Sequence, residues 1–314
     1  MSVVLVTGGA GFIGRWVVKA LLDDGGTVVV LDDFSNGSRD NLAGLGGRLE
    51  VVEGSVADPR AVERAFEARP ERCVHLAAKI NVQRSIDDPV ATFGSDVTGT
   101  LFLLEQARAT RAAFLFMSSC MVYAPASNAA IAESHPVLPA SPYAASKLAG
   151  EYLTLSYGIA YDLPVTVVRP FNTYGPHQRA DGEVGVVAIF CERALREQPI
   201  DVFGDGTQTR DLLYVEDCAE FVVRAAYEER ARGELLNAGT GRDVSINELA
   251  RLIADDGVEV RHVQHPHPQA EIARLVCDST KAEQVLGWRP SVSLDEGVRR
   301  TTAWIAGVSE VAAR

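Results

Sequence analysis

Short apolar runs alternate with longer stretches of helical periodicity along the first 170 residues. The runs carry little polar alternation and span residues 3–6, 27–31, 49–52, 73–76, 113–117 and 165–168. Unbroken apolar runs of this length are typical of strands buried on both faces of a parallel sheet. Helical stretches such as residues 12–23 separate the runs and predict repeated β-α-β units. The pattern therefore predicts an α/β fold built on a doubly wound parallel sheet of the Rossmann type.

The pattern loosens after Pro170. Residues 172–185 are rich in Gly, Pro, His and charge and predict a loop. Beyond the loop we expect a strand at 212–215 and helices at 187–198, 217–229 and 246–255. We therefore divide the chain into a Rossmann domain at 1–172 and a smaller C-terminal, substrate-binding lobe at 173–314, with residues of about 210–240 as candidates to rejoin the sheet.

Composition narrows the class of protein. The chain has 314 residues, of which 47% are hydrophobic and 23% charged, so a disordered chain is excluded. The net charge of −12 argues against a nucleic-acid partner, because a duplex would repel this chain. No apolar run approaches the about 18 residues of a membrane span, and the start lacks the basic region of a signal peptide. The five cysteines form no CxxC pair, which predicts a reduced, cytoplasmic protein without a disulfide framework or a cysteine-rich zinc site.

A glycine-rich turn follows the first predicted strand and opens the first predicted helix. Gly8, Gly11 and Gly14 have GxxGxxG spacing, which permits a tight turn, a close approach of the backbone to a pyrophosphate, and an anion at the helix N-terminus. Asp32 ends the next strand, 18 residues past Gly14, where an acid is expected to bind the ribose 2′-hydroxyl. The turn therefore predicts a dinucleotide site that prefers NAD, while the nearby Arg39 leaves NADP as an alternative.

Tyr143 and Lys147 form a Tyr-x-x-x-Lys pair, whose spacing puts both side chains on one face of a helix. An ammonium beside a phenol favours the phenolate and lowers a pKa that starts near about 10. Ser118 and Ser119 follow the apolar strand at 113–117, whose carboxyl end is expected to face the cofactor. Together these residues predict hydride transfer at an alcohol, with Tyr143 as the general base.

Further motifs extend the pattern over nearly the whole chain. They are His-Leu-Ala-Ala at 75–78, Arg-Pro-Phe-Asn at 169–172, Tyr-Gly-Pro at 174–176, Phe-Gly-Asp-Gly-Thr-Gln-Thr-Arg-Asp at 203–211, Asn-Ala-Gly-Thr-Gly at 237–241 and Leu-Gly-Trp at 286–288. With the glycine turn and the Tyr-x-x-x-Lys pair, they resemble the extended short-chain dehydrogenases/reductases that act on nucleotide sugars. The resemblance implies a tightly held NAD and a UDP- or dTDP-hexose substrate.

The resemblance also assigns roles to the residues that match the family's motifs. It implies an NAD site formed by Gly8, Gly11, Phe12, Ile13, Gly14, Asp32, Asp33, Asn36, Gly37, Ser55, Val56, Leu76, Ala77, Ala78, Lys79, Tyr143, Lys147, Pro170 and Phe171. It implies a substrate site formed by Asn172, Val187, Val202, Phe203, Arg210 and Glu271. Within that site, Asn172 and Arg210 are expected at the diphosphate, Val202 and Phe203 at the base, and Glu271 at the nucleotide ribose. A guanidinium suits phosphate on physical grounds too, although an isolated surface arginine can equally form a salt bridge.

Several positions depart from the family's pattern. Ser55 stands where an Asp usually contacts adenine, so the backbone of Val56 is expected to make that contact. Asp96 replaces an Asn that is usual near the cofactor. The arginine that often precedes Glu271 is absent and Pro-His-Pro occupies 266–268, so the diphosphate is expected to rely on Arg210 with His267.

Cys120 and Met121 bear on which reaction follows oxidation of the sugar at C4. In the family, 4,6-dehydratases carry Asp-Glu directly after the catalytic Ser or Thr, and related decarboxylases carry a Glu; both are disfavoured here. The Ser-Cys-Met segment at 119–121 resembles the UDP-N-acetylglucosamine 5,6-dehydratases of antibiotic biosynthesis, such as the tunicamycin pathway. This implies a catalytic set of Ser119, Cys120, Met121, Tyr143 and Lys147, in which Cys120 assists elimination and Met121 shapes the nicotinamide pocket.

Three functions stay open at this point. On chemistry alone the residues favour a UDP-hexose or UDP-N-acetylhexosamine 4-epimerase, in which Cys120 and Met121 only fill space. The resemblance favours an NAD-dependent 5,6-dehydratase that converts UDP-N-acetylglucosamine to a UDP-6-deoxy-5,6-ene and returns the hydride to C4. A non-catalytic NAD-binding sensor is the third, and the intact set of Ser119, Tyr143 and Lys147 opposes it.

Two weaker signals concern metal binding and assembly. His262, His265 and His267 form an HxxHxH pattern, but prolines break the segment, so an exposed loop is favoured and no metal is expected. Helices near 97–109 and 143–158 carry apolar faces. Packing within one chain explains such faces, and so does the homodimer that the resemblance implies.

Overall fold

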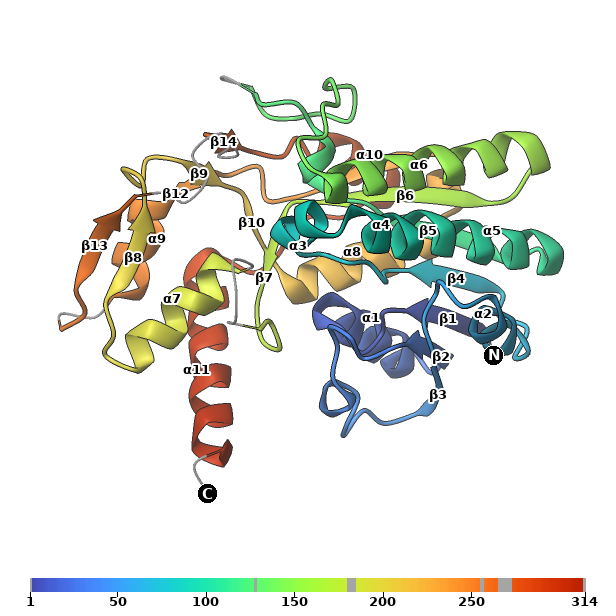
Figure 1. The fold of residues 1–314 in the computed structure, drawn as a ribbon, viewed down its shortest axis with the longest axis horizontal. Helices are drawn as coiled ribbons and strands as arrows, with labels where there is room; N and C mark the ends of the chain where they lie inside the picture. The colour runs from blue at the N-terminus through green and yellow to red at the C-terminus, as the bar shows by residue number, and fades with distance from the viewer. Residues whose placement is uncertain (1, 127–128, 180–184, 255–256, 265–272, 313–314) are drawn as a thin grey trace.

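A single seven-stranded parallel sheet forms the centre of the computed structural model, which describes residues 2–126, 129–179, 185–254, 257–264 and 273–312 (Figure 1). The strand order is β11-β6-β5-β4-β1-β2-β3. The strands are β1 Val3–Thr7, β2 Thr27–Asp32, β3 Arg48–Glu53, β4 Arg72–His75, β5 Ala113–Met117, β6 Val165–Pro170 and β11 Leu235–Ala238. The order reverses between β1 and β4, which creates a crevice at the carboxyl ends of these strands. The predicted doubly wound sheet is confirmed, and β11 brings the chain back into it after a long excursion.

Helices cover both faces of this sheet, because successive strand residues point to opposite sides. Val4 and Val6 of β1 pack in a core cluster with α1 (Phe12–Asp23) and α8 (Val215–Tyr227). Leu5 packs on the other face, in a cluster with α2 (Pro59–Phe66), α5 (Gly99–Thr110) and α6 (Pro142–Tyr161). The unbroken apolar character of β1 therefore reflects burial on both sides.

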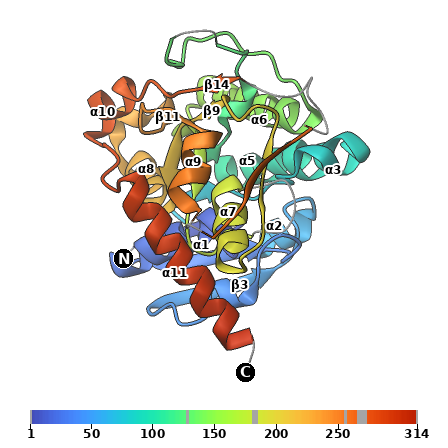
Figure 2. The ribbon, with the colours of Figure 1, turned by 90° about the vertical axis from the view of Figure 1, so that its left-hand side faces the viewer.

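A smaller lobe stands beside the carboxyl edge of the sheet. It contains three helices, of which α7 (Val186–Leu195) packs on both α9 (Ile246–Ile253) and α11 (Leu294–Ala312), as Figure 2 shows. Its strands form small sheets. They are β8 Ile200–Phe203 with β13 Val260–Val263, β9 Thr209–Arg210 with β12 Val244–Ser245 and β14 Arg274–Leu275, and β7 Asn172–Tyr174 with β10 Leu212–Tyr214. A third hydrophobic cluster, which includes Val187 and Val202, fills this lobe.

The remaining elements are short and connect the strands and longer helices. They are α3 Val82–Asp87, α4 Pro89–Phe93, α10 Thr280–Leu286, the 3₁₀ turns η1 Arg39–Asn41, η3 Cys120–Val122 and η4 Glu229–Ala231, and a π-helical turn, η2 Gly94–Thr98. The turn η2 joins α4 to α5 in one continuous helical path, so the helix expected from residue 97 begins earlier than its apolar pattern indicates.

Two expectations about single elements are wrong. β3 was predicted to be buried on both faces, but it is an edge strand paired only with β2, and Arg48, Glu50, Val51 and Glu53 are exposed. Its charged residues agree with an edge position. Residues 172–185 were predicted to be a loop, but Asn172–Tyr174 form the short strand β7. Three residues are too few for a periodic signal, so this pairing depends on tertiary contacts.

Within the ranges described above, no helix is both long and apolar enough to cross a membrane. All five cysteines are buried and free.

Candidate active site

The glycine-rich turn between β1 and α1 is closely packed. Gly8 has a φ of +70°, and its N–H donates to the Leu31 carbonyl at 2.9 Å. A Cβ on Gly14 would lie 2.0 Å from the Gly8 carbonyl oxygen, and one on Gly8 would lie 2.7 Å from the Ala77 nitrogen. No side chain caps α1 at Gly11, so the N–H groups of the first turn, including those of Phe12 and Ile13, face the crevice without a side-chain partner. The turn therefore offers donors to an anion and room for a close ligand.

Asp32 fixes the shape of this turn. Its carboxylate accepts hydrogen bonds from the Ala10 N–H at 2.9 Å and from the Phe34 N–H at 2.8 Å. Burial raises the pKa of Asp32, and the two backbone bonds oppose that effect. The acid that the sequence assigns to a ribose hydroxyl thus also ties β2 to the glycine-rich turn.

The next residues form a charged rim beside Asp32. The Lys79 ammonium donates to the Ser35 hydroxyl at 2.9 Å and lies 3.7 Å from the Asp33 carboxylate. Burial alone would raise the pKa of Asp33, but hydrogen bonds from Ser35 and the Lys79 charge hold it below its usual value. Asn36 is exposed, and Gly37 packs so closely that a Cβ there would meet the Ala10 carbonyl at 2.6 Å.

Arg39 is the residue that made NADP an alternative cofactor, but its side chain contacts other groups of the protein. Its guanidinium lies 4.3 Å from the centre of the Phe34 ring and forms an ion pair with Glu53. This arrangement favours the two carboxylates, Asp32 and Asp33, as the groups that meet the adenosine ribose, and carboxylates disfavour a 2′-phosphate.

The other predicted cofactor residues also come to the carboxyl edge of the sheet. The Leu76 N–H donates to the Thr7 carbonyl at 3.1 Å and the Ala77 N–H to the Thr7 hydroxyl at 3.3 Å. Leu76 to Lys79 are partly buried there, after β4. Ser55 follows β3 and accepts from the Ala57 N–H at 3.2 Å. The structure brings the remaining predicted residues, Val56, Ala78, Pro170 and Phe171, to the ends of β3, β4 and β6, with Val56 and Phe171 almost fully buried.

Helix α6 presents the Tyr-x-x-x-Lys pair. The Ser141 side chain caps the helix by accepting from the Ala144 N–H at 3.2 Å, and Pro142 occupies the first turn. Tyr143 follows at once, and its N–H donates to the Ser85 hydroxyl at 3.1 Å. A Cβ on Gly150 would lie 2.3 Å from the Phe116 ring, so the absence of a side chain lets α6 approach β5 closely. The start of the helix is therefore fixed where the phenol meets the end of the sheet.

Ser119 is the second residue after β5 and caps the short turn η3, beside Tyr143 and Cys120. Its hydroxyl accepts from the Met121 N–H at 3.2 Å, and it lies close enough to lower the pKa of both the Tyr143 phenol and the Cys120 thiol. The neighbouring Ser118 hydroxyl is buried and has no hydrogen-bond partner among the described residues. Ser119 is thus placed to share a proton network with Tyr143, as the sequence predicts.

The lowered pKa that the sequence predicts for Tyr143 differs from the balance of its surroundings, in which burial is the largest effect. The Lys147 ammonium donates to the Met117 carbonyl at 2.9 Å. Burial raises the pKa of Tyr143 above the ordinary phenol value; the Ser119 bond lowers it, and the charges of Asp96 and Cys120 raise it further. Desolvation is the largest effect because the phenol is only 8% exposed, a property that residue spacing does not reveal.

Cys120 is buried in a fourth hydrophobic cluster with Leu275 and Cys277, and Met121 packs at its edge. Burial raises the pKa of the Cys120 thiol to about 12, although the Arg210 charge opposes this. The thiol is therefore protonated at neutral pH and can donate a proton, but it is not a base in this state. Its neighbour Met121 has no group that transfers protons.

The predicted substrate residues divide into two groups. Asn172 follows β6, and its side-chain oxygen is buried without a hydrogen-bond partner among the described residues. Phe203 is 43% exposed, and Arg210 is partly buried with one N–H donated to the Thr209 carbonyl at 2.8 Å. Val187 and Val202, in contrast, are wholly buried in the core of the lobe and offer no surface to a ligand as placed.

Some predicted residues lie outside the described ranges. They are Glu271, His265 and His267. His262 is described, and its Nε2 lies 2.9 Å from the Asn247 side-chain oxygen. In the part of the chain that the structure describes, no group of three or more His, Cys, Asp or Glu side chains could hold a metal ion.

Asp211 is a structural residue of the site to which the sequence assigned no role. Its buried carboxylate accepts from the Thr240 N–H at 2.8 Å, the Gly241 N–H at 2.9 Å and the Cys277 N–H at 3.0 Å. It therefore ties the Arg210 strand to the two segments that follow β11 and β14. Its place at the end of the 203–211 motif was the only available signal. Ser85 accepts the hydrogen bond that positions Tyr143, but no sequence motif marks it as a functional residue.

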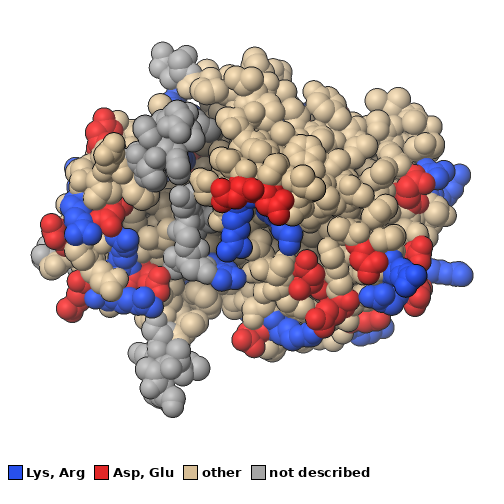
Figure 3. All heavy atoms as spheres, in the orientation of Figure 1, with Lys and Arg blue, Asp and Glu red and all other residues tan. Residues whose placement is uncertain are grey.

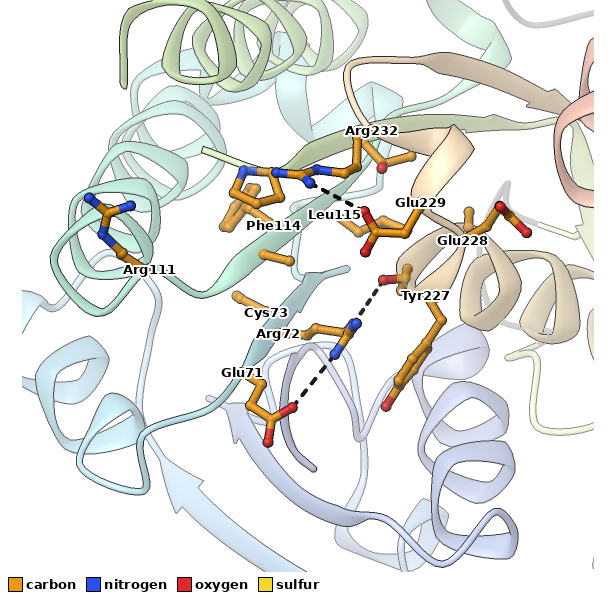
Figure 4. Close-up of a pocket in the computed structure, with 15 residues that line it drawn as sticks. Glu71, Arg72, Cys73, Arg111, Phe114, Leu115, Tyr227, Glu228, Glu229 and Arg232 are labelled. Carbon is orange, nitrogen blue, oxygen red and sulfur yellow. Dashed lines mark hydrogen bonds and ion pairs between the residues drawn. The ribbon is translucent and has the colours of Figure 1, made fainter. Parts of the chain in front are cut away.

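A hollow of about 270 Å³ lies at the opposite, amino edge of the sheet (Figure 4). Glu71 and Arg72 at the start of β4 line it, and Arg72 donates to the Ala226 carbonyl at 3.0 Å. Arg232 and Glu229, which also line the hollow, form an ion pair with a nitrogen–oxygen distance of 3.2 Å. No predicted catalytic or cofactor residue lines this hollow, so it is separate from the crevice at the carboxyl edge.

The residues at the carboxyl edge fit a dinucleotide. The cradle of Gly8 and Gly14 tolerates no side chain, the first turn of α1 is uncapped, and two acids end β2. The unpartnered Ser118 hydroxyl and Asn172 amide oxygen mark buried polar positions that a ligand would satisfy. These features describe an NAD site with a phenol, a lysine and a hydroxyl beside it.

Comparison with known proteins agrees with this class of enzyme. The family model for GDP-mannose 4,6 dehydratase matches residues 5–301. A UDP-glucose 4-epimerase from Mycolicibacterium smegmatis is 40% identical over 311 residues, covering 98% of this chain and 99% of the relative. The chain therefore belongs to the extended short-chain dehydrogenase/reductase family of nucleotide-sugar epimerases and dehydratases.

Solved structures give the same fold. Pal from Bacillus thuringiensis superposes with a TM-score of 0.93 at 51% identity, covering 98% of this chain and 99% of that one. UDP-glucose 4-epimerase from Thermus thermophilus, solved in complex with NAD, superposes with a TM-score of 0.89 at 36% identity, covering 97% and 99%. These relatives' names do not include 5,6-dehydration.

Proposed function

We propose that this protein is an NAD-dependent nucleotide-sugar 5,6-dehydratase that acts on UDP-N-acetylglucosamine and releases a UDP-6-deoxy-5,6-ene. The observation that carries the proposal is the Ser119-Cys120-Met121 segment beside Tyr143. It places a protonated, buried thiol where 4,6-dehydratases of the family carry a pair of carboxylates. The UDP part of the substrate is supported by the 40% identity to a UDP-glucose 4-epimerase.

The cofactor is NAD, held by the glycine-rich turn, Asp32, Asp33 and the segment that ends at Lys79. When bound, NAD takes up and returns the hydrogen and two electrons of the sugar C4–H bond, and its nicotinamide ring brings a positive charge. The chain's own residues handle the protons. Tyr143 takes the proton of the 4-hydroxyl, and the nearby Ser119 hydroxyl, which lowers the pKa of the phenol, shares that proton network.

Lys147 supports Tyr143 through charge. Its ammonium has three donors, of which one binds the Met117 carbonyl. The other two are available to a ribose hydroxyl and to the phenolate. The raised pKa of Tyr143 falls when the positive charges of Lys147 and the bound cofactor both face the phenol.

Cys120 separates this reaction from others in the family. The 4-ketone makes the C5 proton acidic; that proton and the 6-hydroxyl leave together as one water, and a C5–C6 double bond forms. The Cys120 thiol gives its proton to the departing 6-hydroxyl, and the proton released from C5 restores the thiol. Tyr143 takes the proton of the 4-hydroxyl and returns it to the 4-oxygen when C4 is reduced. C4 is then reduced again, so the net change is the loss of one water and NAD is unchanged.

A 4-epimerase is the second candidate, because the Mycolicibacterium relative carries that name. An epimerase needs no acid or base at C5, and Cys120 would then only fill space in its hydrophobic cluster.

Substitution of Cys120 separates the two candidates. With UDP-N-acetylglucosamine as substrate, Cys120→Ala lowers the rate of water loss about 100-fold or more. Cys73→Ala removes a fully buried thiol of β4 that belongs to a different hydrophobic cluster, and is the matched control. Product analysis by mass spectrometry and proton NMR gives the readout. Unchanged turnover in Cys120→Ala would exclude proton transfer by this thiol, and an unchanged mass with inverted C4 would identify an epimerase.

The outer faces of α5 and α6 support a homodimer as the working state. Leu101, Tyr152, Ile159 and Tyr161 are exposed on these helices, and Ile159 is 88% exposed. Figure 3 shows that the surface over α6 carries few charged side chains compared with the surface below it. Apolar helix faces of this kind are buried when two copies pair.

Sedimentation or light scattering tests the homodimer. Ile159→Glu should convert the dimer to a monomer. Val308→Glu changes an exposed valine on α11 in the other lobe and should not. A monomeric wild-type protein would contradict the assignment.

A further inference from the structure

Asp96 is a buried carboxylate in an unusual stretch of backbone. It lies in the π-helical turn η2, between α4 and α5, and is 3% exposed. π-turns of this kind occur often at functional sites, because the extra residue redirects one side chain. The Thr100 hydroxyl donates to the Asp96 carbonyl, and the same hydroxyl lies 3.0 Å from His75 Nε2. Asp96 is therefore fixed by its own backbone as well as by its side chain.

The carboxylate joins two segments of the active site. One oxygen accepts from the Lys79 N–H at 2.9 Å, on the segment that follows β4. The other oxygen accepts from the Ser146 hydroxyl at 3.0 Å, on α6 directly before Lys147. Ser146 also lies 2.8 Å from the Tyr143 carbonyl. Asp96 thus ties the cofactor edge of the sheet to the helical turn that carries Tyr143 and Lys147.

A buried carboxylate is costly unless a cation compensates it. Lys147 directly follows Ser146, whose hydroxyl donates to Asp96, and it is as deeply buried as Asp96. Its ammonium has a neutral carbonyl, that of Met117, as its hydrogen-bond acceptor, and the Asp96 charge favours the ammonium form. The Lys79 ammonium is directed to Ser35 and Asp33 instead. Lys147 is therefore the buried cation available to compensate the charge of Asp96.

The other ionisable groups around Asp96 and Lys147 are neutral or already paired, so they do not compensate these two charges. From α6, Tyr143 and Glu151 also face the pair, and Glu151 is bound to Arg169. From β4, His75 is neutral because burial and the Lys147 charge lower its pKa to about 3. From η3, Cys120 is a protonated thiol. Helix α4 contributes no ionisable side chain.

We propose that Asp96 is the buried counter-ion of Lys147 and a positioning residue whose negative charge sets the protonation state of the Tyr143–Lys147 pair. This proposal rests on the proposed function only in assigning the pair to catalysis. Its physical basis is the contact of Asp96 with Lys79 and Ser146, its burial and its charge. The direction of its effect follows: the Asp96 charge raises the pKa of Tyr143 and supports the ammonium form of Lys147.

Asp96→Asn removes the charge and keeps the shape. The Asn side-chain oxygen still accepts from the Lys79 N–H. The Asn amide then donates to the Ser146 hydroxyl, which turns its own proton to the Tyr143 carbonyl. Loss of the negative charge lowers the pKa of both Tyr143 and Lys147. Both limbs of the pH profile of kcat should therefore move to lower pH by about one unit. Ser146→Ala removes the same contact but keeps the charge, and should leave both limbs in place.

Two readouts separate this proposal from the proposed function. The first is the pH profile of kcat for the NAD-loaded wild type, Asp96→Asn and Ser146→Ala. The second needs no turnover: the ultraviolet absorbance of the Tyr143 phenolate in NAD-loaded protein, with Tyr143→Phe as the blank. A shifted phenolate titration without activity on any nucleotide sugar would sustain the counter-ion role and reject the proposed function. Activity with unmoved limbs and an unmoved phenolate titration would overturn the counter-ion role.

Folding of the variant is checked by thermal unfolding. Should Asp96→Asn fail to fold, Asp96→Ser removes the charge and keeps an acceptor for the Lys79 N–H. It should shift the phenolate titration in the same direction. Failure of both variants to fold while Ser146→Ala folds would show that the carboxylate is only structural, and would overturn the proposal.

Discussion

The Lys147 ammonium donates a 2.9 Å hydrogen bond to the carbonyl oxygen of Met117, the last residue of β5. This contact holds the lysine of α6 against the end of the sheet, one residue before the Ser118-Ser119 pair. The proton-transfer groups and the cofactor edge therefore share one rigid frame. Lys147 reaches Met117 because α6 packs closely against β5.

Tyr143→Phe tests the general base. The variant keeps the ring and loses the hydroxyl, so turnover should fall by about 10² to 10⁴. NAD binding and thermal stability should change little. Tyr157→Phe removes a phenol of the same helix that is bound to Glu105, and should keep most activity. Full function of Tyr143→Phe would instead indicate the non-catalytic NAD sensor.

Gly150→Ala tests the approach of α6 to β5. Its new Cβ would lie 2.3 Å from the Phe116 ring, so the helix or the ring must move. We expect a loss of about 1–3 kcal/mol in unfolding free energy and a lower kcat, because Lys147 moves away from Met117. Gly307→Ala in α11 meets no atom within 4 Å and should be neutral or slightly stabilising. Chemical denaturation and initial rates provide the measurement, and equal effects of the two substitutions would contradict the packing argument.

The buried ion pair of Glu151 and Arg169 predicts a large loss of stability. Both side chains are almost completely buried, and the Arg169 Nε–H donates to Glu151 at 2.7 Å. Arg169→Met leaves the Glu151 charge uncompensated and should cost about 3–5 kcal/mol in urea unfolding. Arg289→Met removes an exposed partner of Glu283 and should cost at most about 1 kcal/mol. Adding Glu151→Leu to Arg169→Met should recover part of the loss, and no recovery would contradict the charge explanation.

His75 predicts a loss of stability in mild acid. Burial lowers its pKa from 6.5 to about 3, so the folded protein binds fewer protons than the unfolded chain between these values. Its contribution is complete above pH 6.5 and is lost as pH falls toward 3, by about 1.4 kcal/mol per pH unit. His177, whose pKa burial lowers to about 4, adds a similar slope down to that pH.

Unfolding free energies between about pH 6.5 and 5 test this slope. His75→Gln should reduce the slope by about 1.4 kcal/mol per pH unit. His262→Gln changes an exposed histidine and should leave it unaltered. An unchanged slope in His75→Gln would rule out His75 as its source.

The sheet could be predicted from the sequence because each buried strand is a short apolar run. The exposed edge strand β3 could not be distinguished from the others, since Leu49, Val51 and Val52 give a similar run to those of the central strands. The glycine turn, Asp32 and the Tyr-x-x-x-Lys pair could also be predicted, because their spacing is local. Ser85 and Asp211 act through contacts between distant segments, which no local pattern records.

The electrostatics of the site could not be predicted from spacing. The lysine four residues after Tyr143 suggests a lowered phenol pKa, but burial dominates and raises it. Val187 and Val202 matched the family's substrate positions, yet they belong to the core of the lobe. Motifs identify which residues are present near the site, whereas burial decides their charge and their access to a ligand.

The most direct test of the 5,6-dehydratase assignment uses UDP-N-acetylglucosamine carrying deuterium at C4. For a 5,6-dehydratase we predict a product lighter by one water, with NMR signals of an exocyclic alkene and with the deuterium still at C4. Deuterium in a 6-methyl group would identify a 4,6-dehydratase. An unchanged mass with deuterium at an inverted C4 would identify a 4-epimerase, and either result would contradict the account.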